Sequence, residues 1–228
     1  MCAMSPRLLR PLASGFSPKK IAGLELWLDG SDSSTITLNA TTVSEWRDKS
    51  RKNNTFTQAT ALSQPTFTAS ARNGRSGINL PANKTLLGPA GFSFAQPTTW
   101  FVTFQAPTTS GGWGLYDGDT ARQHVFGNSQ TEMRMFAGAS PVIATLTGSA
   151  WVAALLIYNG ASSTHRVSTL TASTVNAGAA SITAPRIGSA QGSRGDLGEI
   201  GIFSRALSDT EATAVLKYLS KKWDVTLS

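Results

Sequence analysis

The sequence is poor in cysteine, histidine and charge. Its single cysteine, Cys2, permits no disulfide within the chain and no thiolate metal cluster. The only histidines, His124 and His165, are 41 residues apart, which argues against a zinc site. Charged residues make up 14% of the chain against the usual ~25%, and serine, threonine and asparagine take their place. We therefore predict no metal site and a surface that is polar without being strongly ionic.

The sequence motifs that identify common enzyme classes are also missing. There is no phosphate-binding Walker loop, no dinucleotide fingerprint and no Gly-x-Ser-x-Gly nucleophile elbow. Gly111-Gly112-Trp113-Gly114 is rich in glycine, but no lysine follows it. The sequence thus predicts a protein that is not an enzyme and needs no cofactor.

Long apolar runs are absent as well. No stretch approaches the ~20 residues of a membrane span, and residues 1–12 lack the apolar segment of a signal peptide. We expect synthesis in a cytoplasm, no membrane partner, and a final location reached by another route, such as assembly into a particle.

What is present begins with a basic N-terminal segment. The net charge is +7, and four cations precede the first acid, Glu25. Three prolines interrupt the same stretch and exclude regular structure there. We predict an extended arm over residues 1–20, which is either a solvated tail or a partner-binding arm that acts through Arg7, Arg10, Lys19 and Lys20. Such an arm suits an acidic protein surface, and we do not expect direct binding of nucleic acid.

From residue 21 onward the pattern is that of short strands. Leu24, Leu26 and Leu28 alternate with other residues, which places them on one strand face by period two. The most apolar segments, 98–105 and 151–158, belong in the middle of sheets. Turn residues separate these from further strands at 35–38, 43–46, 66–68, 78–80, 114–116, 124–126, 133–136, 142–146 and 165–170. This pattern predicts an all-β, antiparallel two-sheet jelly-roll sandwich over residues 21–228.

One helix is predicted, at about 209–222. Ser208 and Glu211 match the N-cap and third position of a capping box. Apolar residues then recur at helical spacing and should pack the helix on the sandwich: Val215, Leu216, Leu219 and Trp223.

The two ends of the domain resemble LamG-like jelly-roll domains of the concanavalin A-like lectin/glucanase superfamily. The closing segment 198–211, which runs Gly-Glu-Ile-Gly-Ile-Phe-Ser-Arg-Ala-Leu-Ser-Asp-Thr-Glu, is similar to the last strand and helix start of that family. Tyr218 to Trp223 matches the end of its helix, and 21–32 and 43–50 look like its opening strands. Asn73-Gly74 stands where the family has an Asn-Gly turn. The resemblance covers residues 20–225 and implies the same sandwich fold.

The sequence departs from the family where chemistry would lie. The strand after Asn73-Gly74 runs Ile78-Asn79-Leu80-Pro81-Ala82 and lacks the expected acid, which argues against a calcium or glycan site built there. The Glu-x-Asp-x-x-Glu signature of glycosidases in this superfamily is absent, although their reaction needs two close carboxylates. Closely spaced acids occur only as pairs: Asp29/Asp32, Glu45/Asp48, Asp117/Asp119, Asp196/Glu199 and Asp209/Glu211. We interpret Asp29/Asp32 as a turn, Glu45/Asp48 as a solvated loop and Asp209/Glu211 as part of a helix cap. Asp117-Gly118-Asp119 is either a plain turn, which we favour, or a source of two oxygen ligands for calcium.

Two aromatic residues are candidates for sugar contact. Trp113 and Tyr116 follow the glycine-rich loop and either stack on a sugar ring or pack in the core at a sheet edge.

Modules with these opening and closing segments resemble those in bacteriophage virion proteins and bacterial surface proteins. The leading hypothesis is a structural protein of a phage virion, a capsid decoration protein anchored by its arm on other virion proteins such as the major capsid protein. The alternative is a glycan-binding adhesion module of a phage tail or bacterial surface. Assembly as a homo-oligomer is compatible with both.

Overall fold

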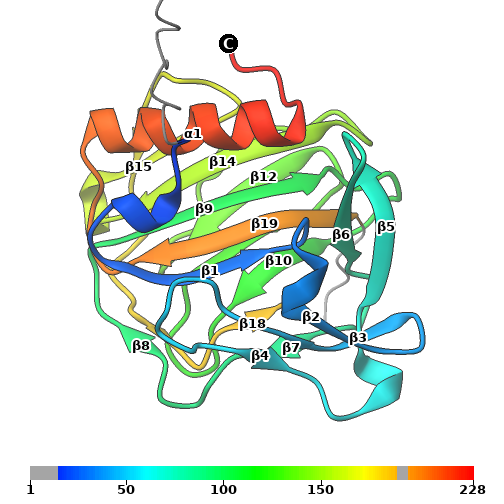
Figure 1. The fold of residues 1–228 in the computed structure, drawn as a ribbon. Coiled ribbons are helices and arrows are strands. Elements are labelled where there is room, and N and C mark those ends of the chain that lie inside the picture. Colours follow the sequence, from blue (N-terminus) through cyan, green and yellow to red (C-terminus); the bar gives the residue numbers. More distant parts are fainter. Residues whose placement is uncertain (1–14, 189–194) are drawn as a thin grey trace, which may run out of the picture.

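A computed structural model of the chain describes residues 15–188 and 195–228, in which two antiparallel β-layers enclose a core and one α-helix covers one layer (Figure 1). The first layer carries the helix and consists of β1 (Leu24–Asp29), β19 (Asp196–Phe203), β9 (Thr98–Gln105), β14 (Trp151–Tyr158), β15 (Ser163–Val167) and β16 (Ser173–Val175). The predicted all-β sandwich is confirmed.

The second layer contains more and shorter strands. Its members are β13 (Val142–Thr145), β12 (Glu132–Phe136), β11 (His124–Gly127), β10 (Trp113–Asp117), β18 (Arg186–Ile187), β7 (Leu86–Leu87), β4 (Phe56–Thr57), β3 (Thr42–Trp46) and β2 (Ile36–Asn39). The hairpin of β5 (Thr66–Arg72) and β6 (Arg75–Asn79) joins the layers, since β6 pairs with β19 and Thr66 pairs with Thr42 of β3. A separate pair is formed by β8 (Ser93–Phe94) and β17 (Ile182–Thr183). Short 3-10 turns lie at Pro18–Lys20, Ser33–Thr35, Ala61–Ser63 and Gly160–Ser162.

The strands β9 and β14 lie in the middle of the first layer, as predicted. They pair along their whole length, and β19 pairs with the other edge of β9. Both faces of β9 are buried: Trp100 and Val102 point between the layers, whereas Phe101 points toward the helix. This double burial explains why β14 is apolar at every position and why β9 carries large apolar side chains on both faces.

The period-two prediction for the first strand is wrong at one residue. Leu26 and Leu28 lie between the layers, but Leu24 lies with Trp27 in the cluster under the helix. A register shift in the pairing of β1 with β19 falls between Leu24 and Leu26. Such a bulge inserts one residue and turns the side chains before it to the other face.

The helix α1 (Asp209–Trp223) extends one residue beyond the predicted end. The Ser208 hydroxyl accepts a hydrogen bond from the Glu211 backbone N–H, and the Glu211 carboxylate accepts one from the Ser208 backbone N–H, so the capping box is confirmed. The four predicted apolar residues are fully buried against β9 and β14. In the described ranges, no helix is long and apolar enough to cross a membrane.

Substitution Ser208→Ala is expected to lower the free energy of unfolding by about 1 kcal/mol, the usual effect of losing an N-cap oxygen. Urea unfolding measures it, with Leu62→Ala, at a residue that is 85% exposed, as the neutral control. An unchanged midpoint in Ser208→Ala would show that the cap contributes nothing.

The predicted extended arm ends earlier than residue 20. Pro18–Lys20 forms a 3-10 turn, and Phe16 packs on Tyr218 with ring centroids 5.6 Å apart. Lys19 lies over the Trp27 ring at 5.5 Å, so it contacts the domain itself. Arg7 and Arg10 lie outside the described residues.

Candidate functional site

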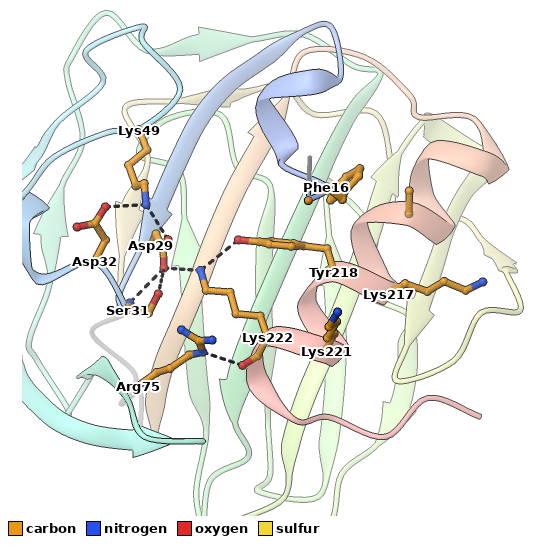
Figure 2. A pocket seen from close by; sticks show the side chains of 12 residues that line it. Phe16, Asp29, Ser31, Asp32, Lys49, Arg75, Lys217, Tyr218, Lys221 and Lys222 are labelled. Carbon is orange, nitrogen blue, oxygen red and sulfur yellow. Dashed lines mark hydrogen bonds and ion pairs between the residues drawn. The ribbon is translucent and has the colours of Figure 1, made fainter. Parts of the chain in front are cut away.

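A hollow of about 780 Å³ lies between α1 and the end of β1 (Figure 2). Four segments that are distant in sequence surround it: the start of the domain at Gly15 and Phe16, the turn after β1, the loop after β3, and the hairpin residue Arg75. The helix supplies Ala214, Lys217, Tyr218, Lys221 and Lys222. We call this hollow the helix pocket.

Beneath the helix pocket lies a fully buried carboxylate, Glu199. It accepts hydrogen bonds from the indole nitrogens of Trp27 and Trp223, at 2.5 and 3.0 Å. The Tyr218 hydroxyl donates to it at 2.8 Å and Lys222 Nζ at 2.7 Å. Burial raises the pKa of Glu199, and the charge of Lys222 opposes this rise. Four donors therefore hold one acid and fix the positions of the two tryptophans and the helix.

A chain of alternating charges continues from Lys222 across the floor of the pocket. Lys222 Nζ also contacts Asp29 at 2.6 Å, Asp29 contacts Lys49 at 2.8 Å, and Lys49 contacts Asp32 at 2.7 Å. Burial alone would raise the pKa of Asp29, but Lys222 and Lys49 outweigh it and hold that pKa below its ordinary value. Asp29 is thus an ionised, fixed acceptor at the pocket wall.

The sequence prediction for Asp29 and Asp32 was a turn, and the structure confirms it. The Asp29 carboxylate accepts from the backbone nitrogen and hydroxyl of Ser31, and Asp32 accepts from the Ser34 hydroxyl. The lysines that complete the network were not predicted as its members.

An aromatic wall closes the side of the pocket toward the N-terminus. It is formed by the tilted pair of Phe16 and Tyr218, both partly exposed. The Tyr218 hydroxyl receives a hydrogen bond from Lys222 at 3.1 Å and donates to Glu199, so its ring is held in place (Figure 2). A fixed, partly exposed aromatic ring is a surface on which a flat apolar face of a ligand can rest.

The prediction that Trp113 and Tyr116 contact a sugar at the surface is wrong, because both side chains are buried. Their exposed fractions are 1% and 0%. Tyr116 stacks on Trp100 at 3.7 Å, and the Trp113 indole donates to the carbonyl of Ser129 at 3.0 Å. A register shift between Gly114 and Tyr116 turns both rings inward, although their spacing in a regular strand would place them on opposite faces. The packing alternative is the one that the structure shows.

The acids of the other pairs are bound by cations, by backbone or, for Asp196, by the side chains of Thr68 and Asn79. Asp117 pairs with Arg122, and Asp119 pairs with Arg186 at 2.9 Å. Asp48 was interpreted as part of a solvated loop, which is wrong: it accepts hydrogen bonds from the backbone nitrogens of Trp27, Ser50 and Asn54 and so shapes the loop. Over residues 15–188 and 195–228, no group of three or more potential metal-ligating side chains comes together.

The two histidines lie in different strands and apart from the helix pocket. His124 on β11 is buried beside Phe126, with ring centroids 4.7 Å apart, and it lines a separate cavity of about 140 Å³ with Arg122 and Phe136. Burial lowers its pKa to about 4, so its imidazole is neutral at physiological pH. Burial also lowers the pKa of His165.

Comparison with known proteins gives structural neighbours only. No family model and no curated sequence matches the chain. A sialidase of Trypanosoma rangeli superposes with a TM-score of 0.57 at 15% identity, over 89% of this chain and 33% of that one. The binding domain of Paraclostridial Mosquitocidal Protein 1 gives 0.60 at 15%, over 88% of this chain and 53% of that one.

A third neighbour matches over nearly its whole length. Domain 4 of AbnA, an extracellular arabinanase of Geobacillus stearothermophilus solved with arabinotriose, gives a TM-score of 0.59 at 9% identity, over 85% of this chain and 98% of that domain. The chain shares the β-sandwich fold of these domains. It spans only a third of the sialidase chain, so this similarity supports a shared fold and nothing more specific. It agrees with the jelly-roll fold that the sequence resemblance implies, and it offers no link to virion proteins.

Proposed function

We propose that this chain is a glycan-binding domain and that the helix pocket is its binding site. The observation that carries the proposal is the Phe16–Tyr218 wall beside a row of fixed hydrogen-bonding groups, in a hollow of about 780 Å³. That volume lies in the range of small-ligand sites, roughly 300–1,000 Å³. A sugar ring offers one apolar face and a rim of hydroxyls, and this wall and floor are complementary to both.

The fold supports the same class of ligand. The AbnA domain, which this chain matches over nearly the whole of that domain, was solved with a bound arabinose oligomer. The glycan-binding alternative of the sequence analysis therefore has a structural parallel. The capsid-decoration hypothesis and the virion location stay predictions of the sequence.

We further propose that the domain binds without turnover. Asp29 and Glu199 both contact the Lys222 ammonium, and Asp29 and Asp32 both contact the Lys49 ammonium. A glycosidase needs one acid to protonate the leaving group and another to attack or to activate water. Glu199 is fully buried and its oxygens accept four hydrogen bonds, while Asp29 is held ionised between two lysines. Neither group is free to deliver a proton to a bound sugar.

Screening the full chain on a glycan array, followed by calorimetry with the best oligosaccharide, tests the proposal. Phe16→Ala is expected to weaken binding by about tenfold, which corresponds to about 1.4 kcal/mol and to the loss of one stacking contact. Phe126→Ala removes a partly exposed ring from β11, away from the pocket, and is the matched control.

Loss of binding in Phe126→Ala with full binding in Phe16→Ala would show that the site lies on the second layer and not in the helix pocket. An array without any hit would contradict glycan binding itself. Release of reducing ends from the bound oligosaccharide would contradict binding without turnover.

A further inference from the structure

The helix pocket carries more positive charge than its own acids neutralise. Five cations line it, and two acids face them; Glu199 beneath adds a third negative charge. The three acids form ion pairs with two of these cations. Lys49 contacts Asp29 and Asp32, and Lys222 contacts Asp29 and Glu199. The five cations therefore exceed the three acids by two positive charges. Three of the cations have no carboxylate partner among the described residues: Arg75, Lys217 and Lys221.

Arg75 is held in a position suited to an incoming anion. Its Nε donates to the backbone carbonyl of Lys222 at 2.9 Å, which fixes the guanidinium against the last turn of α1 (Figure 2). An arginine has five N–H donors, so one anchored nitrogen leaves the outer two for a ligand. A planar pair of N–H groups matches the two oxygens of a carboxylate or sulfate.

The helix places two exposed lysines in the lining of the same pocket, and their spacing does not stabilise the helix. Lys217 and Lys221 are four residues apart and so lie on one helix face, where like charges destabilise a helix by a few tenths of a kcal/mol. The helix dipole favours Lys221 in the last turn, but Lys217 lies outside that turn. An anion bound at the pocket would offset this repulsion.

We propose, building on the glycan-binding function, that the helix pocket selects saccharides that bear a carboxylate or sulfate group. The sugar ring rests on Tyr218 and Phe16, and the acidic substituent is bound by Arg75 and Lys221. The aromatic wall provides a surface for a sugar ring. The cations are gathered around a single hollow and do not form the extended track that suits a nucleic acid or an acidic peptide, so the pocket favours a saccharide.

Calorimetry on the full chain with three oligosaccharides of equal length separates the possibilities: oligogalacturonate, a sulfated oligodextran and neutral arabinotriose. At least one acidic ligand is expected to bind ten times more tightly than the neutral one, and its affinity should fall as NaCl is raised, since salt screens exposed charges. Comparison of the two acidic ligands identifies carboxylate or sulfate as the preferred group.

Charge-removing variants locate the effect. Arg75→Gln and Lys221→Gln are each expected to weaken the binding of the acidic saccharide about tenfold more than the binding of a neutral one. Lys84→Gln, which removes a cation bound to the Leu62 carbonyl outside the pocket, is the matched control and should leave both unchanged. Equal unfolding midpoints of the variants in urea establish that all are folded.

The outcomes distinguish this inference from the proposed function. If the neutral sugar binds as tightly as the acidic ones and Phe16→Ala still weakens it, the glycan-binding function stands and the acidic selectivity is wrong. If no saccharide binds, both are wrong. Equal binding of polyglutamate or a short single-stranded DNA would overturn selectivity for saccharides in favour of a general anion site.

Discussion

Replacing Lys222 by methionine is expected to lower the free energy of unfolding by about 3–5 kcal/mol at pH 7, the usual cost of removing one partner from a buried ion pair. Lys222 is the only cation that contacts both Asp29 and Glu199 among the described residues, and these acids are 4% and 0% exposed. Methionine preserves most of the side-chain volume, so the loss reports the missing charge. Urea unfolding gives the value.

The deficit of Lys222→Met should depend on pH with a definite sign. Lys222 lowers the pKa of both carboxylates, so its removal raises both pKa values in the folded state. The folded variant then binds protons more tightly than the folded wild type, so its stability relative to the wild type increases as the pH falls. The deficit is largest above the raised pKa values of the two carboxylates in the variant, and it shrinks as the pH falls through them.

Lys221→Met is the control for this experiment, because it removes the same charge from the neighbouring exposed position. A change within about 0.5 kcal/mol is expected there. Equal losses in the two variants, or a Lys222→Met deficit that grows in acid, would show that the buried network does not hold the helix on the sheet.

Substitution Trp113→Ala is expected to lower the free energy of unfolding by about 3–5 kcal/mol, the range for a buried tryptophan. Its ring is 1% exposed and lies 5.6 Å from the Phe104 ring between the layers. The Ser129 carbonyl would also lose the indole donor. A tryptophan that served only to contact a sugar would have little effect on stability.

Urea unfolding of Trp113→Ala beside Leu62→Ala makes the comparison direct, since Leu62 is 85% exposed and its truncation should fall within about 0.5 kcal/mol. A Trp113→Ala midpoint equal to that of Leu62→Ala would contradict the buried position.

The features that could be predicted from the sequence are local ones. The α1 start follows from Ser208 and Glu211, which are three residues apart and whose side chains bond to one another and to Arg205. The Asn73-Gly74 turn is equally local: both residues have positive φ, at 51° and 67°, and Arg72 pairs with Arg75 across them. Asparagine and glycine tolerate these angles, which is why their sequence marks a two-residue hairpin.

The candidate site could not be predicted, because its contacts span the chain. Lys222 lies 193 residues from Asp29, and Glu199 lies 172 residues from Trp27. The pairing of β1 with β19 brings Asp29 opposite Glu199, and no period within either strand reveals that register. The bulges that redirect Leu24 and Tyr116 are likewise set by partner strands. Several strands were missed because two residues are too few for a period, as in β4, β7 and β18.

The measurement that tests the glycan pocket most directly is an NMR titration of the full chain with the oligosaccharide that binds best on the array. The account predicts that the largest shifts fall on Phe16, Arg75, Tyr218 and Lys221, with the β11 and β12 resonances unchanged. Shifts that gather around Phe126 and Phe136 on the second layer, with those four residues unmoved, would contradict it.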